Sequence, residues 1–95
     1  GREHRTPGVR RYVIDFDTIA DGLVPDLSVQ GGDADVLSGL SLFQLPDGRG
    51  TRVTFLLSPG EAAALELRFL LRDTAGDPQS PVWLHRWTRK RDGGV

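Results

Sequence analysis

The sequence predicts an all-β sandwich of six to seven short antiparallel strands, and three observations support this fold class. Apolar and polar residues alternate at period two in several short segments, as they do in strands that are buried on one face. Turns rich in glycine, proline and aspartate separate these segments. The chain has 95 residues, which is enough for one small domain with a single core.

The first strand is predicted at 11–17, after a leader or linker over residues 1–9 that shows no periodicity. Within this strand Tyr12, Ile14 and Phe16 share one face, so that face is expected to be buried. The domain itself is expected to extend over residues 10–88.

Residues 20–26 are predicted to form a loop, because glycine and proline interrupt them, and a short strand follows at 27–30. The next apolar run, 35–45, loses its alternation near Gly39, which predicts a bulge or a break in the strand. A turn is predicted at 46–48, where the sequence is Pro-Asp-Gly.

A regular strand is predicted at 51–57, with three inward residues, Val53, Phe55 and Leu57. The signals conflict only after it. Residues 58–61, Ser-Pro-Gly-Glu, resemble a helix start, yet the residues from Leu65 onward alternate at period two. We therefore expect one helical turn at 59–64 followed by a strand, with a continuous helix as the alternative.

Residues 73–80 are rich in residues that favour turns, and the last strand is predicted at 81–87. A disordered, charged tail is expected over 89–95. Six or seven strands with such turns indicate an immunoglobulin-like sandwich, although the Cys–Trp–Cys pattern of antibody domains is absent from this sequence.

Composition excludes several classes of chemistry. The chain has no cysteine, so it has no disulfide framework, thiolate metal site or cysteine nucleophile. It also has no methionine, so we expect a processed protein or a piece of a longer one. No apolar run approaches the roughly 18 residues of a membrane-spanning helix.

The charges are segregated along the chain. Residues 1–11 carry four arginines against one glutamate, and residues 86–95 carry four cations against one aspartate, while the middle is acidic. Such ends either are simply solvated or contact an anionic partner such as a lipid head group. Four cations per end make a weak footprint for nucleic acid, and no nucleic-acid partner is expected.

No catalytic residue, metal site or cofactor is predicted. The sequence lacks a Gly-x-Ser-x-Gly nucleophile motif. The carboxylate pairs Asp15/Asp17 and Asp33/Asp35 lack the glycine-punctuated loop of a dedicated cation site. His85 lies between two tryptophans on one strand face, where a histidine is more often a packed structural residue than a base.

The candidate ligand-binding residues are the aromatic ones on the last strand. Trp83, His85 and Trp87 share one face, and Tyr12 is expected near them on another strand. Such a row suits either stacking against a glycan or contact with another domain. The competing interpretation is that at least one tryptophan fills the core between the sheets.

Four segments carry a family resemblance: 11–16 (RYVIDF), 50–55 (GTRVTF), 65–72 (LELRFLLR) and 82–87 (VWLHRW). Their order and spacing resemble the C-terminal domain of the periplasmic glucans biosynthesis proteins, which act on osmoregulated periplasmic glucans. The resemblance implies a small immunoglobulin-like domain that follows a large N-terminal β-sandwich. It also implies that the acidic catalytic residues and the glucan cleft lie in that large domain.

The hypothesis that follows is a non-catalytic accessory domain of a periplasmic β-glucan biosynthesis protein. By this resemblance the partners are the larger β-sandwich domain of the same protein, β-glucan itself and a membrane glucan synthase. Two other hypotheses stay open: an autonomous carbohydrate-binding module that uses its tryptophans, and a protein-interaction domain that uses its basic ends.

Overall fold

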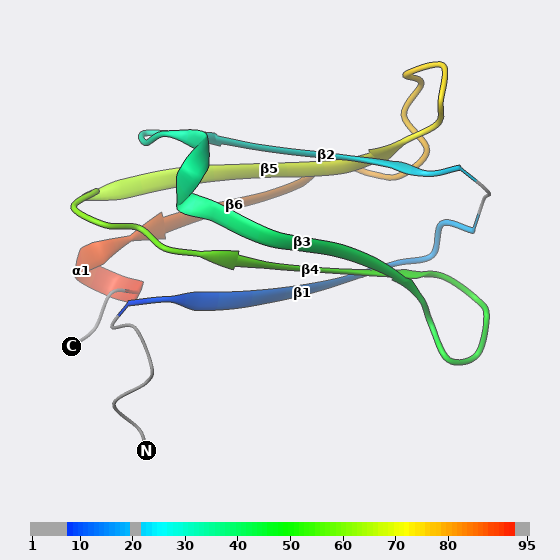
Figure 1. Cartoon of the computed structure of the whole chain (residues 1–95), viewed down its shortest axis with the longest axis horizontal. Helices are drawn as coiled ribbons and strands as arrows, with labels where there is room; N and C mark the ends of the chain where they lie inside the picture. Colours follow the sequence, from blue (N-terminus) through cyan, green and yellow to red (C-terminus); the bar gives the residue numbers. More distant parts are fainter. Residues whose placement is uncertain (1–7, 20–21, 93–95) are drawn as a thin grey trace.

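The chain folds into two three-stranded antiparallel sheets packed face to face, as the sequence predicts. The computed structural model describes residues 8–19 and 22–92. The strands are, in chain order, β1 (Arg10–Phe16), β2 (Val24–Gln30), β3 (Leu37–Gln44), β4 (Thr51–Leu57), β5 (Ala64–Arg72) and β6 (Trp83–Thr88). In Figure 1 the β2-β5-β6 sheet lies above the β1-β4-β3 sheet.

Two short helical segments complete the described chain. The 3-10 helix η2 (Ala34–Val36) carries the chain from β2 in one sheet to β3 in the other. The helix α1 (Arg89–Asp92) follows β6 directly, where the sequence predicts a disordered tail. It lies at the end of the molecule where β1 begins (Figure 1). None of the helices in the described residues is long and apolar enough to cross a membrane.

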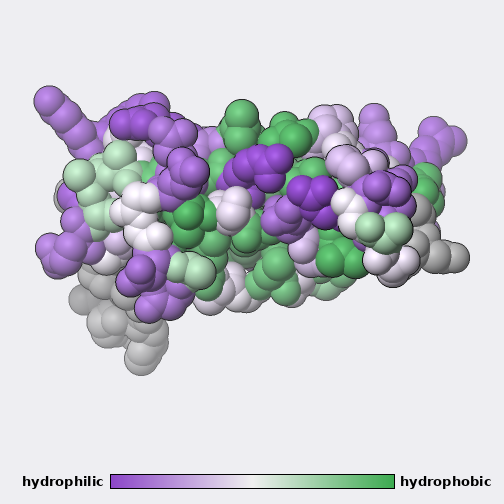
Figure 2. All heavy atoms as spheres, turned by 90° about the horizontal axis from the view of Figure 1, so that it is seen from above, coloured by the Kyte–Doolittle hydropathy of each residue, from purple (hydrophilic) through white to green (hydrophobic). Residues whose placement is uncertain are grey.

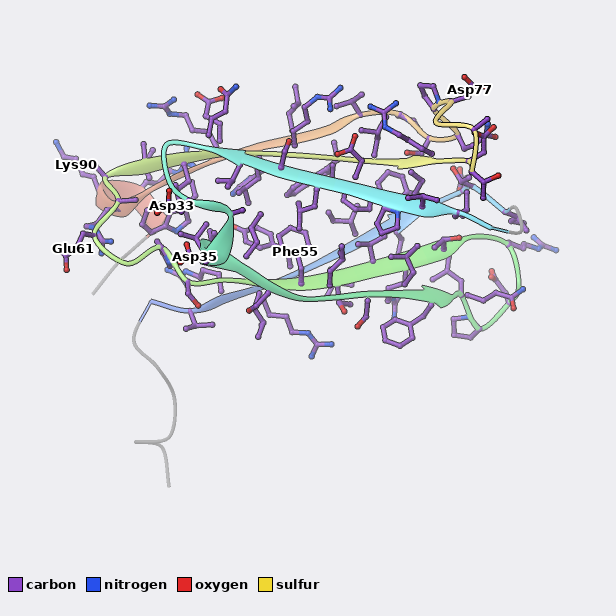
Figure 3. All side chains as sticks on the ribbon, turned by 45° about the horizontal axis from the view of Figure 1, so that its top comes forward. Asp33, Asp35, Phe55, Glu61, Asp77 and Lys90 are labelled. Carbon is purple, nitrogen blue, oxygen red and sulfur yellow. The ribbon has the colours of Figure 1, made fainter. Side chains whose placement is uncertain are left out.

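The core lies between the sheets, and it consists of side chains that the alternation along the strands directs inward. Phe55 of β4 lies between the two layers in Figure 3 and is 1% exposed. The other core side chains come from four of the strands: Phe16, Val53, Leu57, Leu65, Leu67, Phe69, Leu71 and Trp87. Burial of these apolar side chains is the main stabilising contribution to a domain of this size.

Several predicted elements are confirmed. β4 has the predicted bounds and the predicted inward residues. The pairing of β3 with β4 shifts register between Ser38 and Ser41, which places a bulge beside Gly39, where φ is +67°. The turn at 46–48 is closed by a hydrogen bond from the Gly48 N–H to the Leu45 carbonyl, 2.8 Å long.

The predicted helical turn at 59–64 is wrong. The segment is a tight turn in which the Ala62 N–H donates to the Pro59 carbonyl over 3.1 Å. Gly60 has a φ of +61°, which is left-handed and cannot continue a right-handed helix. The strand that follows, β5, begins at Ala64, so the continuous-helix alternative is also wrong.

Two strand boundaries also differ from the prediction. β2 begins at Val24 inside the predicted loop, and it includes Pro25. This proline is tolerated because β2 is an edge strand of its sheet. No strand lies on the open side of β2, so a missing N–H on that side removes no hydrogen bond between strands. β6 begins at Trp83, two residues later than predicted.

Candidate functional site

Three of the four predicted site residues meet where the two sheets come together along β1 and β6. These are the edge strands of their sheets. Tyr12 of β1 packs against Trp83 and His85 of β6, and Phe55 lies beneath them. We call these four residues the aromatic seam. Phe55 is fully buried, and the other three are half-buried.

The rings of the aromatic seam are packed against one another. The Tyr12 ring stacks on Phe55 with 5.2 Å between centroids, and Trp83 stacks on His85 at 5.6 Å. Tyr12 meets the edges of Trp83 and His85 at 5.9 and 5.2 Å. Stacked and edge-to-face pairs at these distances are favourable contacts. One face of Trp83 is therefore already covered by His85, which reduces the ring surface open to a ligand.

Trp87, the fourth predicted site residue, belongs to the core. Its side chain is 0% exposed, so the competing interpretation that a tryptophan fills the core is confirmed for this residue. It pairs with Leu65 in the register of β5 and β6, whereas Trp83 pairs with Phe69. Its indole Nε1 is buried without a hydrogen-bond partner. The guanidinium of Arg89 lies over its ring, 5.3 Å from the ring centroid.

A basic cavity lies beside Trp87, and the sequence patterns did not identify it as a site. It has a volume of about 360 Å³ and is lined by Arg10, Arg11, Tyr12, Trp87 and Arg91. Arg10 and Arg11 are the first two residues of β1, whereas Arg91 lies in α1. The only sequence signal was the basic character of both ends of the chain, and only the fold shows that these ends meet.

The carboxylate pairs do not gather into a cluster. Asp15 forms a two-pronged ion pair with Arg52 across β1 and β4, at 2.8 and 3.0 Å. These hydrogen bonds from Arg52 lower the pKa of Asp15 below its usual range. Asp33 and Asp35 lie around η2, and Asp77 lies at the opposite end of the molecule (Figure 3). Within the described residues, no three His, Asp or Glu side chains come together as a potential metal site.

Comparison with known proteins agrees with the resemblance found in the sequence. The chain is 35% identical over 88 residues to glucans biosynthesis protein D of Xylella fastidiosa strain 9a5c, and equally similar to that of strain Temecula1. The match covers 81% of this chain but only 16% of the relatives, so the chain spans about a sixth of their length.

No family model matches the chain, and no solved structure does. The assignment therefore rests on the curated relatives, which carry the family name that the four sequence segments predicted. The chain resembles one small domain of the glucans biosynthesis proteins.

Proposed function

We propose that this chain is a non-catalytic accessory domain of a periplasmic β-glucan biosynthesis protein, and that it packs on a larger glucan-binding domain of that protein. The observation that carries the proposal is the match to the relatives. It covers most of a self-contained two-sheet sandwich and only 16% of the relatives' length. The remaining length is ample for a larger domain against which this one packs.

The strand order supports the immunoglobulin-like part of the proposal. If β1 is taken as strand B, the sheets β1-β4-β3 and β2-β5-β6 have the orders B-E-D and C-F-G. These are the pairings of the seven-stranded immunoglobulin sandwich without its first strand. Domains of this architecture serve many functions, so the docking surface has to be argued from its own residues.

The outer face of the β1-β4-β3 sheet is the docking surface that we propose. It exposes Val13, Leu40, Phe43 and Leu56, each between 37% and 52%. A hollow of about 300 Å³ lies beside Leu56 and is bounded by Arg11, Gly39, Thr54 and Phe55. Among the described residues, the Asp15–Arg52 ion pair is the only one on this face. A cluster of exposed apolar side chains with few charges is typical of a surface that is covered by another domain.

The opposite outer face is less suitable for docking, because charged groups lie between its apolar side chains. In Figure 2, which looks onto the β2-β5-β6 sheet, hydrophilic and hydrophobic residues are interspersed. The ion pairs Arg72–Asp26 and Arg86–Glu66 lie on this face. Leu84 is 70% exposed but lies beside Arg68 of the neighbouring strand.

Footprinting with hydroxyl radicals tests the docking surface. Oxidation of Phe43, Leu56 and Leu84 is compared between the isolated chain and the longer protein that carries the domain. We expect Phe43 and Leu56 to be protected severalfold in the longer protein, while Leu84, the matched control on the other face, is oxidised equally. Protection of Leu84 alone, or of none of the three, would contradict the proposed surface.

A carbohydrate-binding module is the second candidate, because Trp83 is half-exposed at the aromatic seam. Titration of the isolated chain with a linear β-1,2-glucan, followed by backbone NMR and tryptophan fluorescence, separates the two functions. The accessory role predicts no saturable change at 82–87. Saturable shifts centred on those residues would instead show a glycan-binding module.

A further inference from the structure

The strand β1 has one edge beside which the structure describes no other strand. Among the described strands β1 pairs with β4 alone, and Figure 1 shows it as the outermost strand of its sheet. In the seven-stranded immunoglobulin sandwich the place beside strand B is taken by strand A. The architecture therefore accommodates a further strand beside β1, and the N–H and C=O groups along an edge strand are a template for one.

The outward side chains of β1 make the strand complementary to itself. Arg11, Val13 and Asp15 alternate with the residues that face the core, and all three are exposed. When two copies of such a strand pair antiparallel about Val13, the residue two positions before the centre lies opposite the residue two positions after it. Arg11 of each copy then lies opposite Asp15 of the other copy, and the two Val13 side chains lie opposite each other.

The ion pair within each copy extends this complementarity across the sheet. Asp15 binds Arg52 of its own chain at 2.8 Å, across the pairing of β1 with β4. In the paired strands each Asp15 lies between Arg52 of its own copy and Arg11 of the other, and a carboxylate accepts hydrogen bonds from both guanidinium groups. Opposite charges directly across an antiparallel pair attract, with Cβ atoms about 5 Å apart. Two such charged rows flank the contact between the Val13 side chains, which are 52% exposed in the single chain.

The other three edge strands of the described sheets lack this arrangement. β2 carries a single charged residue, Asp26, and it also contains Pro25. β3 carries no charged residue, and β6 carries no acidic one. An antiparallel pair of any of these strands with itself therefore places no opposite charges across from each other. Charge complementarity favours β1 as the edge through which two copies of the chain meet.

We propose that two copies of this chain pair through the open edges of β1, antiparallel and centred on Val13, so that their β1-β4-β3 sheets join into one continuous sheet. The contact has two-fold symmetry, as in most homodimers, because the same residues meet on both sides. One pair of short strands buries less area than a standard interface, so we expect a weak dimer with a Kd of roughly 10 to 500 μM. The proposal does not depend on the accessory role, because edge pairing lies in the plane of the sheet and leaves its outer face open.

Sedimentation equilibrium of the wild-type chain, over concentrations from about 10 μM to about 1 mM, measures the association. We expect the average mass to rise from that of a monomer towards that of a dimer and no further, because the two-fold contact is closed. Sodium chloride should weaken the association, since salt screens the attraction between Arg11 and Asp15. A mixture of isotope-labelled and unlabelled chains should show a nuclear Overhauser contact between the Val13 methyl groups of the two copies.

Charge reversal identifies the contact and its register. Arg11→Glu places a glutamate opposite Asp15, and Asp15→Lys places a lysine opposite Arg11, so each variant alone should self-associate about tenfold more weakly. Mixed in equal amounts, the two variants should associate again, because the introduced glutamate then lies opposite the introduced lysine. Asp15→Lys also removes the exposed pair with Arg52, which contributes little stability, and circular dichroism checks that each variant remains folded.

Arg68→Glu is the matched control, since it reverses an exposed arginine on β5, the central strand of the other sheet, and should leave the association unchanged. A wild-type chain that stays monomeric at the highest concentration would overturn the proposal. Failure of the mixed variants to associate would overturn the register centred on Val13 and the proposal with it. If Arg68→Glu weakened the dimer as much as Arg11→Glu does, the interface would lie on another surface.

Discussion

At the residue scale, two leucines on adjacent strands show that the sheet face on which a side chain lies determines how much it contributes to the stability of the fold. Leu67 of β5 points into the core and is 1% exposed, whereas Leu84 of β6 points outward and is 70% exposed. We expect Leu67→Ala to reduce the free energy of unfolding by about 2–5 kcal/mol, because it leaves a cavity. Leu84→Ala should change it by less than about 0.5 kcal/mol. Urea denaturation measures both, and equal losses would contradict the assigned faces.

The Asp15–Arg52 pair predicts a pH dependence of stability. Arg52 lowers the pKa of Asp15 in the folded state, so the pair stabilises the fold fully above the ordinary aspartate pKa. This contribution is lost as the pH falls through the lowered pKa. We expect wild type to lose more stability than Asp15→Asn between neutral pH and strongly acidic pH. The difference should be small because both side chains are more than 40% exposed and salt screens the pair.

Measurement of urea midpoints across that pH range, at low and at high salt, tests this expectation. Parallel curves for wild type and Asp15→Asn would contradict it, because they would show that protonation of Asp15 does not change the stability of the fold.

The site residues were predictable in part, and the reason is geometric. Alternation along β6 correctly places Trp83, His85 and Trp87 on one inner face. It does not show how deep each one lies, since depth depends on the neighbouring strand and on what closes the end of the sandwich. Trp87 therefore became a core residue, while Trp83 stayed half-buried. The basic cavity was not predictable, because it joins residues about 80 positions apart in the sequence.

At the element scale, strands with an uninterrupted alternation were predicted to within one residue, and those that contain a proline or a glycine were predicted less closely. β4 has no such residue and matches its prediction. β2 contains Pro25, which favours a loop by local rules and is accepted only because the strand lies at a sheet edge. The turn before β5 resembled a helix start because local capping signals say nothing about the sign of φ at Gly60.

The junction between β1 and β4 depends on one glycine. A Cβ added at Gly50 would lie 2.2 Å from the Phe16 carbonyl oxygen and 2.9 Å from Leu45 Cδ1. The backbone would have to move, so we expect Gly50→Ala to cost about 3 kcal/mol or more. Gly76→Ala is the control: its φ is +93° but nothing lies within 4 Å, so only backbone strain of about 1–2 kcal/mol is expected.

Thermal and urea unfolding of both glycine variants give the comparison. If Gly76→Ala proved the more destabilising of the two, the close approach at Gly50 would not be the constraint that we infer.

At the scale of the whole molecule, the number of strands and the sandwich class followed from the sequence, but the pairing of strands did not. Periodicity identifies which face of a strand is buried, but it does not show which other strand pairs with that strand. Only the structure shows that β1 pairs with β4 and β2 with β5, rather than each with the next strand. With this crossed pairing, β1 and β6 are the edge strands of their sheets, and the aromatic seam and the basic cavity both lie along them.

The same crossed pairing has a consequence for synthesis on the ribosome. Residues Arg10 and Leu57 are partners, so β1 must wait until β4 has emerged before it gains its hydrogen bonds. Contacts that are so distant in sequence close slowly, because the loop entropy is lost before the contacts form. The hairpin of β3 and β4 is local and can form first, and β1 then adds to its free edge. A nascent chain that stops short of β4 therefore leaves an unpaired strand open to association with other chains.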